Sequence, residues 1–210
     1  MTKRNPAVQD IRSRTRELMR TELASAAVDL FAERGFNNVT IEDIAATTGV
    51  SRRTFFRYFP TKEDVVIGQL ESLSFDIAAA LDARPADEAV WDSLRASAYT
   101  SLQRIGNNPE GNLRVYQMLE ATPALQAARS AKHRKRQELL QPLVRQRLLA
   151  QGVVSRAKAD MAASALIGAA MSCYDTALQT WSASGGKRDA IGVLDTVMGL
   201  VGDLTSRSVS

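Results

Sequence analysis

The chain has 210 residues, of which 45% are hydrophobic and 6% aromatic, and its formal net charge is +4. Its only cysteine, Cys173, excludes an intrachain disulfide and is compatible with a reducing cytoplasm. The N-terminus lacks the apolar region of a signal peptide, and no apolar run approaches the roughly 18 residues of a membrane span, so we expect a soluble, cytoplasmic protein.

The excess positive charge lies at the N-terminal end of the chain. Residues 1–62 contain eleven Lys and Arg against seven Asp and Glu, whereas sixteen bases face sixteen acids from residue 63 onward. This placement predicts a polyanion partner for the N-terminal part alone. The alternative is a basic tail that serves solubility or is disordered.

Residues 40–62 have the pattern of two short helices joined by a glycine turn. Thr40 can cap the first helix through its hydroxyl, and Asp43 stands where a capping box usually has Glu or Gln. Gly49 can adopt the left-handed conformation that ends a helix. Ser51 is a good N-cap for the next helix, and Pro60 ends that helix.

The second of these helices separates apolar from basic residues. Phe55, Tyr58 and Phe59 recur at a spacing of three and four, which predicts a buried stripe. The pattern favours a helix-turn-helix, whose second helix enters the major groove of DNA. An ordinary helical hairpin also uses a glycine turn, but it does not explain three arginines and a lysine with no acid in residues 51–62. The residues left on or near the outward side are Arg52, Arg53, Thr54, Phe56 and Arg57.

Residues 22–66, ELASAAVDLFAERGFNNVTIEDIAATTGVSRRTFFRYFPTKEDVV, resemble the N-terminal domain of the TetR family of bacterial transcription regulators. The elements AxxLFxExGF, TxxDIA, GVS and TFFRYFPTKE occur in this order. Within the family the chain looks closest to a subgroup whose C-terminal domain binds acyl-CoA-like ligands. That closer resemblance is carried by SRRTFFRYFPTKEDV, by ATPALQA at residues 121–127 and by Trp181.

We expect the first turn of the second helix to read bases. Arg52 and Arg53 can each form a bidentate pair with guanine O6 and N7, and Thr54 can bond a phosphate or meet a thymine methyl group. The resemblance puts an aromatic residue, commonly Tyr, at Phe56, where the missing hydroxyl leaves apolar contact with thymine. Backbone N–H groups at the start of the first helix, beside Thr40, can hold a phosphate.

The resemblance also implies phosphate contacts for Arg57, Tyr58 and Lys62. Arg14 and Arg16, together with Arg12, can follow the DNA backbone or reach a minor groove. The expected DNA-contacting residues are Thr40, Ser51, Arg52, Arg53, Thr54, Phe56, Arg57, Tyr58, Lys62, Arg14 and Arg16.

Beyond residue 62 the pattern predicts further helices, and the fold class is all-α. Pro142 is expected to bend one of these helices, because it removes a backbone hydrogen bond. We predict an N-terminal three-helix helix-turn-helix DNA-binding domain with a basic arm in residues 1–62, and a C-terminal helical ligand-binding and dimerisation domain in residues 63–210. The expected C-terminal helices are 62–82, 87–105, 110–120, 123–151, 155–181 and 189–205.

The last two helices are rich in small and aliphatic residues, which permit close helix approach. In the family these helices pair with those of a second subunit in a four-helix bundle, so the resemblance implies a homodimer. The alternative is that the stripes only complete the core of the monomer. The residues concerned are Ala162, Ala165, Leu166, Ala169, Ala170, Ile191, Leu194, Val197, Met198 and Val201.

A controlling ligand is expected in the C-terminal domain. A mostly apolar pocket with a few polar groups suits a hydrophobic effector. The basic run at residues 132–136 could hold a phosphate-bearing head group such as that of coenzyme A, and the alternative is a solvated helix face. His133, the only histidine, has no metal partners near it, and no metal or cofactor is predicted. The candidate pocket residues, each of which could also be plain core, are Phe75, Leu94, Tyr99, Met118, Leu119, Met171, Tyr174 and Trp181.

Together these features predict a ligand-responsive transcription regulator, a repressor released from a palindromic double-stranded DNA operator by a small hydrophobic or acyl-CoA-like effector. No constellation of catalytic residues is found, so an enzyme is not expected. The alternatives are a helical enzyme or lipid-binding carrier with an incidental basic N-terminus, and an activator or a regulator without a ligand.

Overall fold

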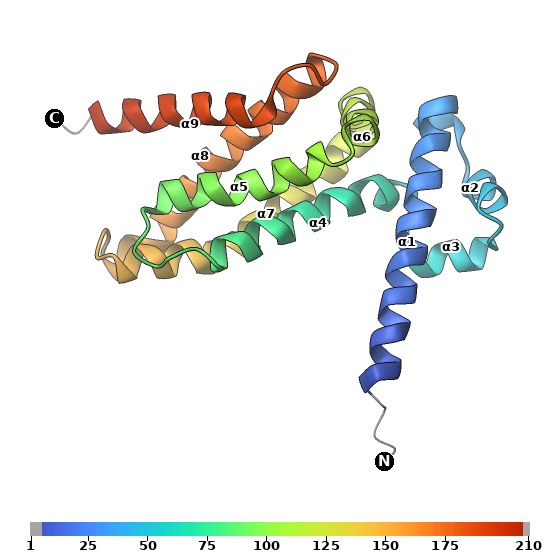
Figure 1. Cartoon of the computed structure of the whole chain (residues 1–210), viewed down its shortest axis with the longest axis horizontal. Coiled ribbons are helices and arrows are strands. Elements are labelled where there is room, and N and C mark those ends of the chain that lie inside the picture. The colour runs from blue at the N-terminus through green and yellow to red at the C-terminus, as the bar shows by residue number, and fades with distance from the viewer. Residues whose placement is uncertain (1–5, 208–210) are drawn as a thin grey trace. The chain divides into compact units, whose positions relative to one another are not determined.

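The computed structural model describes the backbone of residues 6–207 and the side chains of residues 14–68, 72–130 and 133–203. Within these residues the chain is helical and contains no strand, which confirms the predicted all-α class. The elements are α1 (Pro6–Arg34), η1 (Phe36–Asn38), α2 (Ile41–Thr47), α3 (Arg52–Tyr58), α4 (Glu63–Asp82), α5 (Val90–Gly106), α6 (Pro109–Ala121), α7 (Pro123–Ala150), α8 (Arg156–Ala183) and α9 (Ala190–Arg207) (Figure 1).

The helices from α4 onward agree with the expected ranges to within three residues at each end. The largest difference is the start of α5, because the chain makes a turn after Pro85, where the N–H of Glu88 donates to the Pro85 carbonyl at 3.3 Å. Pro142, which was expected to bend its helix, lies inside α7, and α7 continues as a single helix on both sides of it. The chain divides into two compact units, residues 1–68 and 69–210, so the division falls inside α4 rather than at residue 62.

The first unit is built on aromatic packing between short helices. In it, α1 packs against η1 and α2, and α2 packs against α3. Phe31 of α1 and Phe36 of η1 lie with ring centroids 4.9 Å apart, and the ring centroids of Phe55 and Phe59 are 5.7 Å apart. All four rings are buried. Each aromatic side chain removes a large apolar area from water when it is buried, so these four rings contribute strongly to the stability of this small unit.

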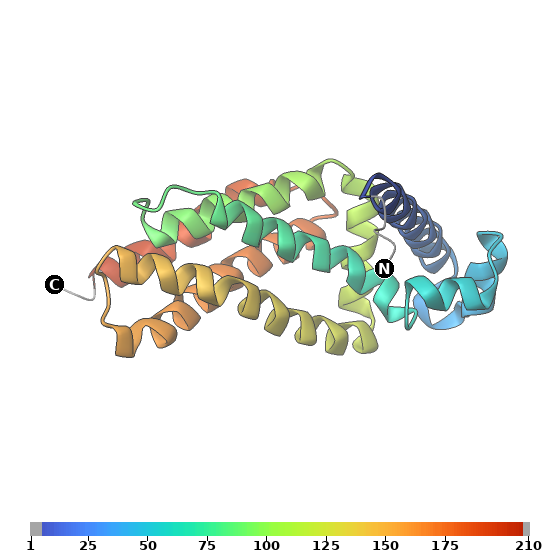
Figure 2. The same cartoon turned by 90° about the horizontal axis from the view of Figure 1, so that it is seen from below.

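The second unit is arranged around α8, which packs against α7 and α9 and also against α5 and α6 (Figures 1 and 2). Small side chains allow these helices to approach closely. On α8, Ala163, Ala170 and Ala177 are buried, and α5 contributes the buried Ser97 and Ser101. By length and composition α8 could span a membrane, contrary to the expectation from sequence, but buried helices of soluble cores pass the same test. Its buried face identifies it as the core helix of this unit.

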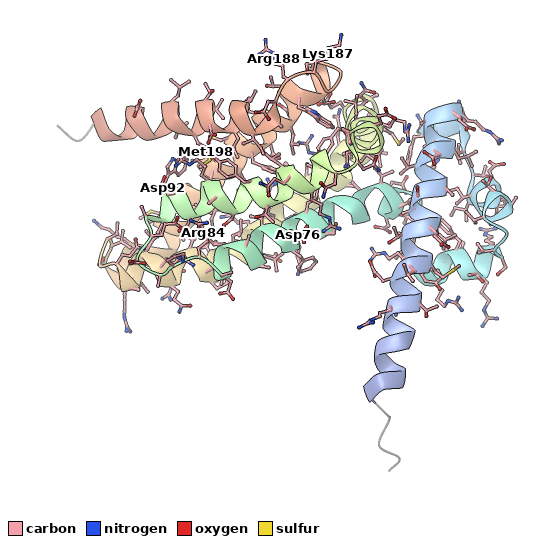
Figure 3. All side chains as sticks on the ribbon, in the orientation of Figure 1. Asp76, Arg84, Asp92, Lys187, Arg188 and Met198 are labelled. Atoms are coloured by element: carbon pink, nitrogen blue, oxygen red, sulfur yellow. The ribbon has the colours of Figure 1, made fainter. Side chains whose placement is uncertain are left out.

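Contacts from α5 and α8 hold α9 in place. The indole N–H of Trp91 donates to the carbonyl of Met198, which is labelled in Figure 3, at 3.3 Å. Tyr99 donates to the carboxylate of Asp195. Leu194 and Met198 are fully buried, so this part of the predicted dimerisation stripe belongs to the monomer core.

Arg147 of α7 closes the C-terminal end of α4. The last carbonyls of a helix have no partners within the helix. The buried guanidinium of Arg147 donates to three carbonyl oxygens there, those of Leu81 at 2.6 Å, Arg84 at 2.7 Å and Pro85 at 2.7 Å. Figure 3 shows Arg84 near this end of α4. A cation at this position also complements the negative end of the helix dipole.

Replacing Arg147 should destabilise the second unit strongly. Arg147→Met leaves the Arg84 carbonyl without its donor, whereas the Leu81 and Pro85 carbonyls keep only the longer hydrogen bonds from the N–H groups of Arg84 at 3.2 Å and Glu88 at 3.3 Å. A buried unpaired acceptor costs about 1–3 kcal/mol, so we expect the free energy of unfolding to fall by about 2–3 kcal/mol. Urea denaturation followed by the fluorescence of Trp91 and Trp181, which both lie in this unit, measures the change. The control is Arg145→Met, because Arg145 is 41% exposed and makes a surface ion pair with Asp160. It should lose no more than about 1 kcal/mol, and equal losses in the two variants would contradict the capping role.

Candidate DNA-reading helix and ligand cavity

A reciprocal capping box begins α2, as predicted. The N–H of Asp43 donates to the Thr40 hydroxyl oxygen at 3.1 Å, and the N–H of Thr40 donates to the Asp43 carboxylate at 2.8 Å. These hydrogen bonds from Thr40 lower the pKa of Asp43, so the acceptor stays ionised at neutral pH. The turn after α2 is equally well defined. Gly49 has φ 68°, and the N–H of Val50 donates to the Ala45 carbonyl at 3.0 Å, which completes a Schellman motif.

Burial of two aromatic rings sets the orientation of α3. Ser51 caps the helix by accepting the N–H of Thr54 at 3.1 Å. Phe55 and Phe59 are at most 1% exposed. Tyr58, expected in the same stripe, is only half-buried, and its hydroxyl accepts a hydrogen bond from Arg57 at 3.4 Å. The side of α3 that faces solvent carries the remaining predicted residues: Arg52, Arg53, Phe56 and Arg57 are exposed, and Thr54 is half-exposed.

Arg52 is held in place by residues on both helices. Its guanidinium lies 2.8 Å from the carboxylate of Glu42 on α2 and 5.5 Å from the centre of the Phe56 ring. Both partners of the ion pair are more than half exposed. Exposed pairs of this kind contribute about 0–1 kcal/mol, so Arg52 can exchange Glu42 for another acceptor at little cost. No ion pair is found for Arg53 among the residues whose side chains are described.

Lys62 contacts protein carbonyls in this structure. Its ammonium group donates to the carbonyl oxygens of Phe36 at 2.9 Å and Val39 at 3.2 Å, and it lies 4.5 Å from the centre of the Phe36 ring. These contacts hold the segment between η1 and α2. The sequence did not predict that Lys62 would make them. The expected phosphate contact of Lys62 stays a prediction.

The basic N-terminal segment is helical from Pro6 onward, since α1 continues without interruption to Arg34. Arg14 and Arg16 are exposed on this helix. Arg12 lies outside the described side chains. Arginines on a helix lie at a fixed spacing and direction from one another. An extended arm would instead let each arginine side chain take its own position along DNA.

The second unit contains a small cavity between α4, α6, α7 and α8. It is partly open, and the space inside holds water-sized groups rather than a whole acyl chain. Asp175 is one of its lining residues, and Arg136 approaches the Asp175 carboxylate at 3.0 Å, whereas Arg129 and His133 each approach it at 3.6 Å. Burial is the main reason that the pKa of His133 is lowered, so the imidazole is neutral at neutral pH. The lining residues are Leu73, Ser74, Ile77, Tyr116, Arg129, His133, Arg136, Tyr174 and Asp175.

The lining of this cavity differs from the predicted pocket. Eight pocket residues were proposed from the sequence, and Tyr174 is the only one of them that lines this cavity. The prediction selected apolar side chains on helix faces. Most of these side chains are buried in the core of the unit, where they pack against other helices. Leu94 and Leu119 are fully buried, Met171 and Trp181 are buried, and Trp181 packs edge-on against Tyr116 with ring centroids 5.9 Å apart. Tyr99 bonds Asp195, Met118 is half-buried, and Phe75 is 50% exposed.

The basic run at residues 132–136 divides between the cavity and the surface. His133 and Arg136 line the cavity, and the His133 side chain is also 45% exposed. Arg134 and Lys135 are exposed outside the cavity, and the side chain of Lys132 is not among those described. Arg129 and Asp175 were missed. The spacing of Arg129, His133 and Arg136, four and then three residues, places them on one helix face and could have indicated a site. The partner Asp175 is supplied by another helix and has no such signal.

Comparison with known proteins places this architecture in a class. Residues 23–67 match the family described as bacterial regulatory proteins of the tetR family. TcmR of Streptomyces glaucescens, an HTH-type transcriptional regulator, is 30% identical over 60% of this chain and 58% of its own length, less than two thirds of that relative. MftR of Mycobacterium tuberculosis, which is named for the regulation of mycofactocin biosynthesis, is 26% identical over 84% of this chain and 87% of its own.

Among solved structures, FadR of Thermus thermophilus is similar with a TM-score of 0.53 and 25% identity, over 86% of this chain and 92% of that one. That structure is described as a TetR-family transcriptional repressor in complex with lauroyl-CoA. An N-terminal helix-turn-helix domain followed by a helical C-terminal domain is the architecture of the TetR-family transcription regulators to which this chain is similar. Within this class, residues 23–67 of the chain match the tetR family, and the relatives and solved structures named above are the proteins to which the chain is similar.

Lys62 should stabilise α2 and α3 before any DNA is present. Lys62→Met leaves the carbonyls of Phe36 and Val39 without their donor, a loss of about 1–3 kcal/mol. We therefore expect the backbone amides of α2 and α3 to exchange with solvent about tenfold faster or more in the free protein, as measured by hydrogen exchange. Arg53→Ala, which removes an exposed side chain from the same region, should leave the exchange unchanged. Unaltered protection in Lys62→Met would limit Lys62 to a role in DNA binding.

Proposed function

We propose that this protein is a ligand-responsive transcriptional repressor that binds a palindromic DNA operator as a homodimer. The observation that carries the proposal is the solvent-facing side of α3, where Arg52, Arg53 and Arg57 project from a helix fixed by its cap and by two buried rings. Arg52 and Arg53 stand in the first turn of the helix, the part that meets base edges in this motif. Arg57 and Tyr58 lie further along it and contact phosphates.

Dimerisation through α8 and α9 is part of this proposal. Leu166 on α8 and Val197 on α9 are half-exposed, and Met161 and Leu200 on the same helices are 68% and 59% exposed. Apolar surface on two adjacent helices suits packing against a second copy. A dimer would place two recognition helices about 34–36 Å apart, one turn of the DNA helix.

An effector would release the DNA by shifting the population of two arrangements of the C-terminal helices. Support for this comes from α4, which begins soon after α3 and contributes Leu73 and Ile77 to the cavity wall. A ligand that alters this wall would move α4 and change the separation of the two recognition helices. By the resemblance to the FadR structure, the effector is hydrophobic or acyl-CoA-like.

Selection of bound DNA from a random pool tests the proposal directly. We expect a palindrome whose half-sites are one helical turn apart, bound with a steep dependence on salt. A folded dimer without sequence-selective binding at low salt would overturn the proposal and favour a helical enzyme or lipid carrier.

Two arginine variants should separate base reading from phosphate binding. Arg52→Ala should lose about 1–3 kcal/mol on the operator but little on random DNA, because a bidentate guanine contact discriminates bases. Arg57→Ala should weaken both DNAs alike and reduce the salt slope by about one, because a phosphate contact carries no sequence information. Binding isotherms on operator and random DNA at several salt concentrations measure both effects. Equal losses on the two DNAs for both variants would contradict this division.

A further inference from the structure

Three basic side chains of α7 surround one carboxylate of α8 in the cavity of the second unit. Arg129, His133 and Arg136 share a face of α7 because of their spacing. Arg136 approaches Asp175 at 3.0 Å, whereas Arg129 and His133 lie 3.6 Å from it. At 3.6 Å a contact is too long for a good hydrogen bond. Asp175 therefore satisfies Arg136 best, and Arg129 only partly.

The described side chains of this wall include two arginines and one acid. The two arginines are permanent cations, and their side chains are only 9% and 14% exposed for Arg136 and Arg129. His133 adds no charge at neutral pH, because burial lowers its pKa. Among the described residues that line the cavity, Asp175 is the one acid. Among these described side chains the two arginines outnumber the one acid, and an uncompensated charge is costly at a buried site.

Donors for an anion are present beside this charge. A guanidinium has five N–H groups, and Arg136 uses two of them on Asp175. The planar arrangement of these groups matches the paired oxygens of carboxylate and phosphate. The ring of Tyr174, 5.4 Å below the guanidinium of Arg136, supports it from one face.

The rest of the cavity wall is mainly apolar. Leu73 and Ile77 of α4 are buried there, together with the rings of Tyr116 and Tyr174. Burial raises the pKa of both phenols, so they stay neutral. The hydroxyl of Tyr174 is already paired with Ser101 at 2.7 Å. A charged group beside an apolar wall matches a ligand that has an anionic end and an apolar body.

We propose that this cavity binds the anionic group, a carboxylate or a phosphate, of an amphipathic ligand. Arg136 and Arg129 bind the anion next to Asp175, and Leu73 and Ile77 contact its apolar body. The cavity as it stands holds water-sized groups, so the anion enters at its open side and a longer apolar body requires the wall to open. This inference rests on the proposed ligand-responsive function, since it supplies the chemical class of the effector.

Calorimetric titration of the full chain with three matched probes tests the site: decanoate, decanoyl-coenzyme A and the neutral ester methyl decanoate. We expect at least one of the two anionic probes to bind, with the ester at least about tenfold weaker. Arg136→Gln should raise the Kd of that anion by about tenfold to a hundredfold, and Arg129→Gln should raise it in the same direction. Arg134→Gln makes the same change on the same helix at an exposed position outside the cavity, and should leave the Kd unchanged.

The two anionic probes distinguish the source of the charge. Tight binding of decanoate assigns a carboxylate, and binding of decanoyl-coenzyme A without decanoate assigns a phosphate. The site is overturned if no probe binds, if the ester binds as tightly as the anions, or if Arg129→Gln and Arg136→Gln behave like Arg134→Gln. Thermal unfolding without ligand shows whether each variant is folded. If Arg136→Gln does not fold, Arg129→Gln and the comparison of anion with ester decide the outcome.

Operator binding, measured in parallel, separates this inference from the proposed function. Anion binding that leaves operator affinity unchanged would contradict ligand-controlled repression but keep the site. Operator binding by a protein that takes up none of the three probes would contradict the site and keep the regulator.

Discussion

Helices α2 and α3 have seven residues each, too few to be stable in water on their own, so they depend on tertiary contacts. The burial of Phe55 and Phe59 supplies these contacts and at the same time fixes the rotation of α3. With these two rings inside, the helical period places Arg52, Arg53 and Arg57 in solvent. The caps at Thr40 and Ser51 then fix where each helix begins. The geometry of the basic surface is thus a consequence of core packing.

Buried arginines serve two different purposes in the second unit. Arg147 is matched to its surroundings, because three carbonyl oxygens accept its N–H groups and complete the end of α4. Arg136 and Arg129 instead share one described acceptor, the carboxylate of Asp175, which Arg136 approaches at 3.0 Å and Arg129 at only 3.6 Å. A fully satisfied cation stabilises the fold, whereas a cation in excess leaves capacity for an anion. Arg147 and Arg136 are arginines on the same helix, so the residue type does not distinguish them. They differ in the number of acceptor groups around each guanidinium.

Much of the fold could be predicted because its signals are local. The caps at Thr40 and Ser51, the glycine turn at Gly49 and the buried rings of α3 each follow from residues within one or two turns of each other. The contacts of Lys62 could not be predicted in this way, since its acceptors are backbone carbonyls 23 and 26 residues away. Backbone carbonyls have no identity in a sequence, so no pattern marks them.

The residues of the ligand pocket were even harder to predict from the sequence than the contacts of Lys62. Apolar residues such as Leu94 and Leu119 have the same pattern whether they line a cavity or fill a core, and here they fill the core. The sequence by itself determined the all-helical class, the helix-turn-helix and the basic surface of α3, because these depend on periodicity, caps and the order of residues along the chain. Only the tertiary structure decided where Lys62 binds and which residues surround the cavity. Asp175 meets Arg129, His133 and Arg136 through the packing of α8 on α7, and such a meeting of distant segments depends on how whole helices pack.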